Sequence, residues 1–200
     1  MRVVDAKVVE PIDFVLAIDM SKSMMETDLH PDRLAATKRA VNAFVASKQP
    51  RDRIGVVIFA QTYVVVVPLT QDASELQHAV SKLKIGDVPA LGTGMGDGMA
   101  LAIDQVKASS AQRREIILIA DGDANWVEKF TVEDSTATAK SLGIKVHTVL
   151  VANEPIDAGW SSSNPKQLQN IAAGTGGTFS HASDDDTFDM ALATIRGQSR

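Results

Sequence analysis

The sequence contains no cysteine among its 200 residues. This absence excludes disulfide bonds, thiol nucleophiles, iron–sulfur clusters and every zinc site built on cysteine ligands. Long apolar runs are also lacking: the valine run 64–67 ends at Pro68, and no stretch reaches the roughly 18 apolar residues that a membrane-spanning helix needs. The sequence therefore predicts no direct membrane insertion by this segment.

The chain carries fewer positively than negatively charged side chains. Twenty Lys and Arg residues stand against 25 Asp and Glu residues, which gives a net charge of −5 at pH 7. This balance argues against nucleic acid and anionic membrane surfaces as partners, because both are bound mainly through cationic side chains. The hydrophobic share of 44% and the charged share of 22% are typical of a globular protein.

The length fits one folded unit. We expect a single domain over residues 1–200, with a core at about 12–195, cut from a longer protein. The chain as given is expected to be soluble. Residues 1–13 are too charged for a signal peptide. A membrane anchor in a missing flank would place the domain in the periplasm, and the sequence leaves a cytoplasmic location open as well.

Short apolar runs alternate with stretches of helical periodicity. The strand-like runs are residues 14–18, 55–59, 63–67, 116–120, 145–151 and 177–180. The helix-like stretches are residues 31–45, 73–83, 99–106, 132–142, 165–173 and 185–195. This alternation predicts an α/β fold with a largely parallel central sheet. Only three residues separate 55–59 from 63–67, too few for a crossover helix, so these two strands should pair antiparallel.

Two of the most apolar predicted strands end in an aspartate, Asp19 and Asp121. In open α/β sheets, ligands bind beyond the carboxyl ends of the strands. After the first strand, Asp19, Ser21 and Ser23 alternate along the chain, so their oxygens can converge on one point. Several hydroxyls with only one or two carboxylates suit a hard divalent cation such as Mg²⁺. The pattern therefore predicts a cation site at this edge of the sheet.

Three segments together resemble the metal-ion-dependent adhesion site (MIDAS) of von Willebrand factor A (VWA) domains. Asp19-x-Ser21-x-Ser23 and Asp121-Gly122 each follow a predicted buried strand, and Thr93 lies in a glycine-rich loop before a helix. The first segment alone is a weak match, but the three in this order are specific. The resemblance covers about residues 12–195.

Further segments narrow the resemblance. Residues 28–34, 52–56 and 92–97 are similar to bacterial Bat-type proteins of the aerotolerance operon, whose genes commonly lie beside genes for MoxR-type AAA+ ATPases. The implied VWA fold is Rossmann-like and doubly wound, with helices on both faces of a mostly parallel sheet. It would place the strands ending at Asp19 and Asp121 side by side, and residues 63–69 as a short antiparallel edge strand.

The resemblance also implies roles for single residues. Ser21, Ser23 and Thr93 would bind the metal directly, Thr93 in the ligand-competent state. Asp19 and Asp121 would act directly or through water. The ion would be Mg²⁺, Mn²⁺ or Ca²⁺, and one coordination position would remain for an Asp or Glu of a protein partner.

The sequence departs from the MIDAS pattern at two positions. Lys22 occupies a place often filled by glycine, and Ala120 stands where threonine often precedes the aspartate. The Lys22 ammonium could repel an ion or shield an empty site. Neither departure removes a ligand. An alternative nevertheless stays open in which the polar residues persist but bind little metal.

Other residues near the predicted site have two interpretations. Asp97 and Asp123 could lie just behind the metal ligands, or could serve as helix-cap and turn residues. Met20, Met24 and Met25, together with Trp126, could form an apolar rim that contacts a partner, or the methionines could pack in the core.

We therefore expect a non-enzymatic, cation-dependent protein-binding module in a bacterial complex-assembly or chaperone-like system. Its partner would present an Asp or Glu, and candidates are a MoxR-type AAA+ ATPase system or another VWA protein. Two alternatives stay open. One is a metal-dependent phosphohydrolase that uses Asp19 as nucleophile or ligand, and the other is an assembly subunit with a vestigial metal site.

Overall fold

A six-stranded sheet forms the centre of the protein. The structure is a computed structural model that describes residues 10–153 and 164–199. The strand order is β3-β2-β1-β4-β5-β6, and only the β2–β3 pair is antiparallel. The strands are β1 (Ile12–Asp19), β2 (Arg53–Phe59), β3 (Tyr63–Thr70), β4 (Arg113–Ala120), β5 (Lys145–Val151) and β6 (Phe179–Ala182). The expected mostly parallel sheet with an antiparallel edge strand is confirmed.

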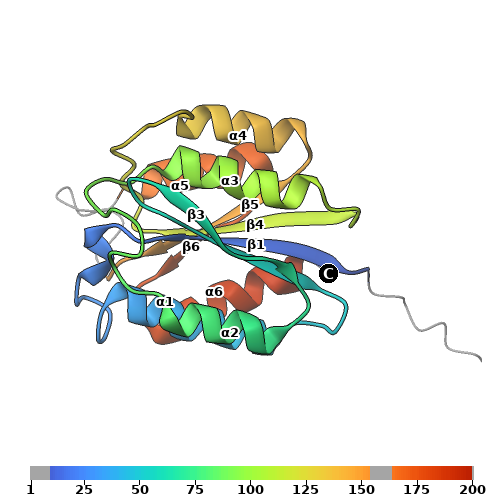
Figure 1. The fold of residues 1–200 in the computed structure, drawn as a ribbon, viewed down its shortest axis with the longest axis horizontal. Helices are drawn as coiled ribbons and strands as arrows, with labels where there is room; N and C mark the ends of the chain where they lie inside the picture. Colours follow the sequence, from blue (N-terminus) through green and yellow to red (C-terminus); the bar gives the residue numbers. More distant parts are fainter. Residues whose placement is uncertain (1–9, 154–163, 200) are drawn as a thin grey trace, which may run out of the picture.

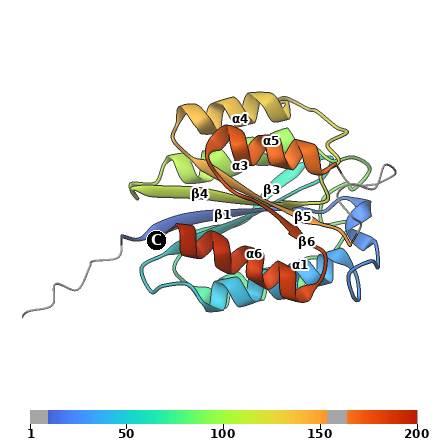
Figure 2. The ribbon, with the colours of Figure 1, turned by 180° about the vertical axis from the view of Figure 1, so that it is seen from behind.

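Helices cover both faces of the sheet (Figures 1 and 2). One face carries α1 (Arg33–Ala46), α2 (Ala73–Lys82) and α6 (Asp185–Gln198). The other face carries α3 (Met95–Lys107), α4 (Val132–Ser141) and α5 (Pro165–Thr175). The doubly wound α/β fold expected from the sequence is thereby confirmed.

The side chains of β1 alternate between two hydrophobic cores. Phe14, Leu16 and Ile18 pack in the core beneath α1, α2 and α6. Val15 and Ala17 pack in the core beneath α3, α4 and α5. Because successive strand side chains point to opposite faces, a strand covered on both faces must be apolar at nearly every position. This is why the central strands appear in the sequence as continuous apolar runs.

The strand order reverses between β1 and β4. From β1 the chain continues to β2 on one side, whereas β4 pairs with the other side of β1. The parallel register places Ile18 opposite Ile119, so both strands end at the same level of the sheet. The residues that follow them meet at this switch point, which is where doubly wound sheets bind ligands.

Several elements begin a few residues earlier than expected, such as α3 at Met95 and β4 at Arg113, and two further differences concern the loop after β1 and the start of β6. A single 3-10 turn, η1 (Lys22–Met25), follows β1 and was not expected. Strand β6 begins at Phe179 instead of residue 177, because the Gly177 N–H donates to the Ala172 carbonyl and closes the end of α5. Within the described ranges, no helix combines the length and apolar character needed to cross a bilayer.

A buried polar cluster lies at the end of the sheet opposite the switch point. Glu115, near the start of β4, accepts hydrogen bonds from the Ser199 hydroxyl and lies 3.1 Å from Nε2 of His147 on β5. All three residues are at most 3% exposed. Burial tends to raise the pKa of Glu115, but the contacts with His147 and Ser199 outweigh it and leave the pKa lowered.

Glu115→Gln is therefore expected to destabilise the protein in a pH-dependent way. A carboxylate with a lowered pKa stabilises the folded state above its unfolded pKa, about 4.5, and this contribution is lost as the pH falls through the folded value. Urea unfolding should show a loss of about 1–3 kcal/mol at pH 7 and a smaller loss at about pH 3.5. The exposed Glu75→Gln should change stability little at either pH, and a pH-independent loss for Glu115→Gln would contradict the assignment.

Candidate functional site

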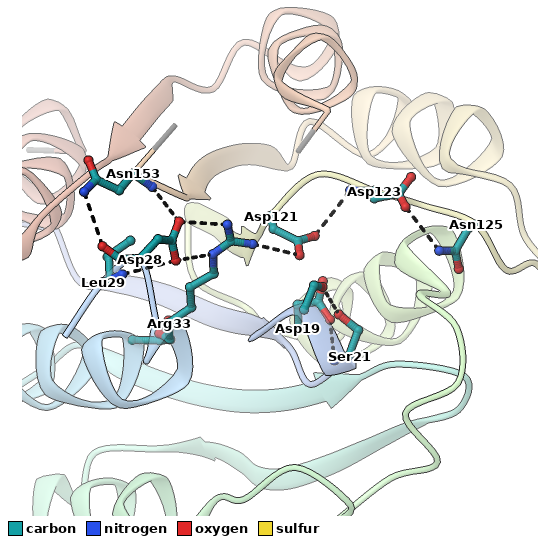
Figure 3. A network of polar contacts seen from close by, with 11 residues as sticks. Asp19, Ser21, Asp28, Leu29, Arg33, Asp121, Asp123, Asn125 and Asn153 are labelled. Atoms are coloured by element: carbon teal, nitrogen blue, oxygen red, sulfur yellow. Dashed lines mark hydrogen bonds and ion pairs between the residues drawn. The ribbon is translucent and has the colours of Figure 1, made fainter. Parts of the chain in front are cut away.

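Two buried carboxylates lie together at the carboxyl ends of β1 and β4. Asp19 and Asp121 are both 0% exposed. Oδ1 of Asp19 accepts the Ser21 backbone N–H at 2.7 Å, which turns the chain sharply after β1 (Figure 3). Oδ2 of Asp19 is also buried but has no hydrogen-bond partner among the described residues. A buried carboxylate oxygen without a donor is costly, so this atom is open to a cation.

The two predicted serine ligands come together in the loop after β1. The hydroxyl oxygens of Ser21 and Ser23 lie 3.0 Å apart. The Met20 N–H donates to the Phe59 carbonyl at the end of β2, and the Met20 side chain is buried, so the loop is fixed at its start. Lys22 points outward and is exposed. Its ammonium therefore does not fill the space among the site residues.

The pKa values of Asp19 and Asp121 reflect their burial and the charges around them. Burial raises the pKa of Asp19 to about 8, and the neighbouring charge of Asp121 adds to the shift. Burial also raises the pKa of Asp121; hydrogen bonds from Ser23 and Asp123 and the charge of Arg33 oppose this without cancelling it. Each carboxylate would ionise more readily beside a cation.

Thr93 lies in a loop that is tied to the segment after β4. Its N–H donates to Oδ1 of Asn125 at 2.9 Å, and its carbonyl accepts the Trp126 N–H at 3.3 Å. The neighbouring glycines allow close contacts on two sides: a Cβ on Gly92 would lie 3.0 Å from Cβ of Trp126 in the segment after β4, and one on Gly94 would lie 3.0 Å from the carbonyl oxygen of Ala60 after β2. The glycine-rich sequence is thus needed for close packing.

A chain of hydrogen bonds links the Thr93 loop to Asp121. Nδ2 of Asn125 donates to Oδ2 of Asp123 at 3.2 Å, and the Asp123 N–H lies 3.4 Å from Oδ1 of Asp121 (Figure 3). Asp123 therefore lies directly behind a predicted metal ligand and joins it to Asn125. Asn125 was not among the residues predicted for the site.

The donor set can hold a cation only if the hydroxyls take part. Within the part of the chain that the structure describes, no group of three or more His, Asp or Glu is placed to hold a metal ion. The predicted set has just two carboxylates, Asp19 and Asp121. The unpartnered Oδ2 of Asp19 and the adjacent hydroxyls of Ser21 and Ser23 nevertheless fit a hard cation that accepts oxygen ligands and retains water.

Comparison with known proteins identifies the family. The family model for the von Willebrand factor type A domain matches residues 14–124, more than half of the chain. The chain belongs to the von Willebrand factor A family. The expected family is thereby confirmed. Domains of this family often mediate protein–protein interactions.

Bacterial proteins are among the relatives of this VWA domain. An uncharacterized protein of Borreliella burgdorferi is 26% identical over 90% of this chain and 56% of its own length. A UPF0353 protein of Mycolicibacterium paratuberculosis is 32% identical over 68% of this chain and 43% of its own length. The chain therefore spans about half the length of the curated relatives that it matches.

Solved structures with the same fold include two Bat-type proteins. BatB from Bacteroides thetaiotaomicron aligns with a TM-score of 0.81 at 21% identity, covering 94% of this chain and 98% of that one. An aerotolerance-related membrane protein from Bacteroides fragilis aligns with a TM-score of 0.79 at 22% identity over the same shares. The VWA domain of the type V pili tip protein Mfa5 from Porphyromonas gingivalis has a TM-score of 0.74 at 17% identity, covering 96% and 97%.

Asp97 of the VWA domain anchors the loop after β4. It is 1% exposed in the first turn of α3, and its two carboxylate oxygens accept the backbone N–H groups of Glu128, Lys129 and Phe130 at 2.8–3.0 Å. These three bonds hold the loop that carries Asn125 and Trp126. The observed contacts of Asp97 are thus those of a loop anchor and not of a helix cap, because Gly94 is the N-cap of α3 and Thr131 is the N-cap of α4.

The expected apolar rim needs a correction. Met24 is 0% exposed, because the η1 turn directs it into the core with Met20, so it cannot contact a partner. Its neighbour Met25 is 58% exposed, and Trp126 is 42% exposed. Met25 and Trp126 are therefore the members of the proposed rim that are accessible.

The structure also reveals a buried arginine that the sequence analysis missed. Arg33 is 1% exposed, and its guanidinium points toward both Asp28 and Asp121 (Figure 3). One signal was present in the sequence. Arg33 follows Asp32, the N-cap of α1, so it occupies the helix end where the macrodipole disfavours a cation and where nearby anions must compensate.

Asp97→Ala should destabilise the VWA domain by about 3 kcal/mol, because it removes a buried carboxylate and leaves three backbone N–H groups without their acceptor. Urea unfolding measures the change. Asp104→Ala is the matched control, since Asp104 lies on the same helix, is exposed and pairs with the exposed Lys107. Equal stability of the two variants would argue against the anchoring role.

Proposed function

We propose that this VWA domain binds a divalent cation and uses it to bind an acidic side chain of a partner protein. The residues that would hold the ion are Asp19, Ser21, Ser23, Thr93 and Asp121. The observation that carries the proposal is the buried Oδ2 of Asp19, which has no hydrogen-bond partner in residues 10–153 and 164–199 and lies at the start of the loop that holds the paired serine hydroxyls.

The composition of the site supports capture of a carboxylate. Mg²⁺ is favoured over softer metals because every proposed donor is oxygen, and Mn²⁺ or Ca²⁺ could replace it. Because the hydroxyl ligands are neutral, a bound dication would keep much of its positive charge. It would therefore attract one more anionic oxygen. The exposed side chains of Met25 and Trp126 would add apolar contacts around this charged anchor.

The nature of the partner follows from the same reasoning. It would be a protein with an accessible Asp or Glu, either in a MoxR-type AAA+ ATPase system or in another VWA protein. A role in bacterial complex assembly agrees with the Bat-type structures that share the fold. One of them is described as a membrane protein, which supports a membrane-anchored full-length protein with this domain in the periplasm.

The site is less suited to phosphoryl chemistry. A phosphohydrolase acting through Asp19 needs a cationic side chain free to hold the phosphate. Arg33 is already paired with Asp28 and Asp121, and Lys22 points into solvent. We therefore favour binding over catalysis.

Calorimetry of Mg²⁺, Mn²⁺ and Ca²⁺ binding tests the metal site. The wild type should bind at least one of these ions, and Asp19→Asn should weaken binding by at least about tenfold, because it removes the charge of the carboxylate with the unpartnered oxygen. Asp104→Asn on the exposed side of α3 should bind as the wild type does. Equal affinity of Asp19→Asn and wild type would eliminate this site.

Pull-downs with and without Mg²⁺ test the mode of partner binding. Proteins retained by the wild type should be lost in EDTA and largely lost with Thr93→Ala, which removes one proposed metal ligand. Thr138→Ala on the exposed side of α4 is a control for an ordinary threonine substitution. Retention that survives both EDTA and Thr93→Ala would favour an assembly subunit with a vestigial metal site.

A further inference from the structure

Arg33 forms a buried ion-pair bridge at the carboxyl end of the sheet. Its Nε and Nη2 each donate to one oxygen of Asp28 at 2.8 Å, and its Nη1 donates to Oδ2 of Asp121 at 3.4 Å. Asp28 is held in turn by the backbone N–H groups of Leu29 and Asn153. The guanidinium therefore joins the start of α1 to the ends of β4 and β5.

Burying this guanidinium is costly, so its partners must compensate. The side chain is 2% exposed and lies at the N-terminus of α1, where the helix dipole also disfavours a cation. The carboxylates of Asp19, Asp28, Asp121 and Asp123 lie in this cluster, the charge of Glu26 also acts on the guanidinium, and Arg33 is paired with Asp28 and Asp121. Without Arg33, Asp121 would lose the positive charge that now faces it.

We propose that Arg33 is a permanent counter-cation of the site, which partly neutralises Asp121 before any metal binds and thereby limits how tightly the site holds a dication. This inference has two halves. The metal-dependent half, the limit on metal affinity, rests on the proposed function. The metal-free half, the partial neutralisation of Asp121, does not. Arg33 acts through Asp121 and is a positioning residue, with no place among the ligands.

The two contacts of Arg33 differ in strength, and this difference makes the role testable. The pairing with Asp28 is bidentate and short, whereas the contact with Asp121 is single and long. Asp28 therefore offsets most of the guanidinium charge. Removing the charge of Asp28 should increase the positive potential at Asp121, while removing Arg33 should decrease it.

The metal-free half is tested by a double-mutant cycle in EDTA at neutral pH. Unfolding constants are measured by urea titration for wild type, Arg33→Met, Asp121→Asn and the double variant. Asp121→Asn should stabilise the Arg33→Met background at least about tenfold more, in the unfolding constant, than it stabilises the wild-type background. Arg33→Lys, which keeps the charge, should respond to Asp121→Asn as the wild type does. The same effect of Asp121→Asn in every background would overturn the counter-cation role.

The metal-dependent half is tested by Mg²⁺ calorimetry on variants that break the same ion pair from either side. Asp28→Asn should weaken Mg²⁺ binding about tenfold, and Arg33→Met should strengthen it about tenfold. A merely structural bridge would weaken binding in both variants, so changes in the same direction, or no change, would overturn the inference. Asp28 is partly exposed, so Asp28→Asn is expected to fold, and Arg33→Gln, which also removes the charge, replaces Arg33→Met if that variant does not fold.

The wild-type measurement separates this inference from the proposed function. If the wild type binds no Mg²⁺, Mn²⁺ or Ca²⁺, the proposed cation site is wrong, and the double-mutant cycle in EDTA then decides the role of Arg33 by itself. If the wild type binds metal and the two variants do not shift affinity in opposite directions, the proposed cation site is supported and the counter-cation role of Arg33 is wrong.

Discussion

The parallel pairing of β1 with β4 is the constraint on which the site depends. It brings Asp19 and Asp121 to one buried position at the point where the strand order reverses. Burial raises the pKa values of both carboxylates, and the charge of Asp121 adds to the shift at Asp19. The surrounding loops are arranged around this excess of negative charge, because the fold must offset it with donors or cations.

The compensation comes from separate parts of the chain. Backbone N–H groups of Ser21 and Asp123 face the two carboxylates, and Arg33 reaches Asp121 from α1. Oδ2 of Asp19 is left without a partner among the described residues. The site is therefore partly neutralised without a metal and keeps one buried oxygen that the proposed cation would meet.

Much of the fold followed from local pattern, and the errors have local causes. The hairpin of β2 and β3 was predictable because three residues cannot hold a crossover helix. The start of β6 was displaced because the Gly177 N–H closes α5, a contact that no periodicity reports. Met24 was assigned to a rim because sequence spacing does not define the η1 turn that directs it inward.

The sequence by itself determined the alternation of strands and helices and the carboxylates that end β1 and β4. These features depend on neighbours along the chain, where periodicity and residue size suffice. Only the tertiary structure decided which charges meet. Arg33 and Asp121 are 88 residues apart in sequence, and Asp97 meets its three N–H groups more than 30 residues away. Such long-range pairs arise from the packing of whole elements, which leaves no periodic trace in the sequence.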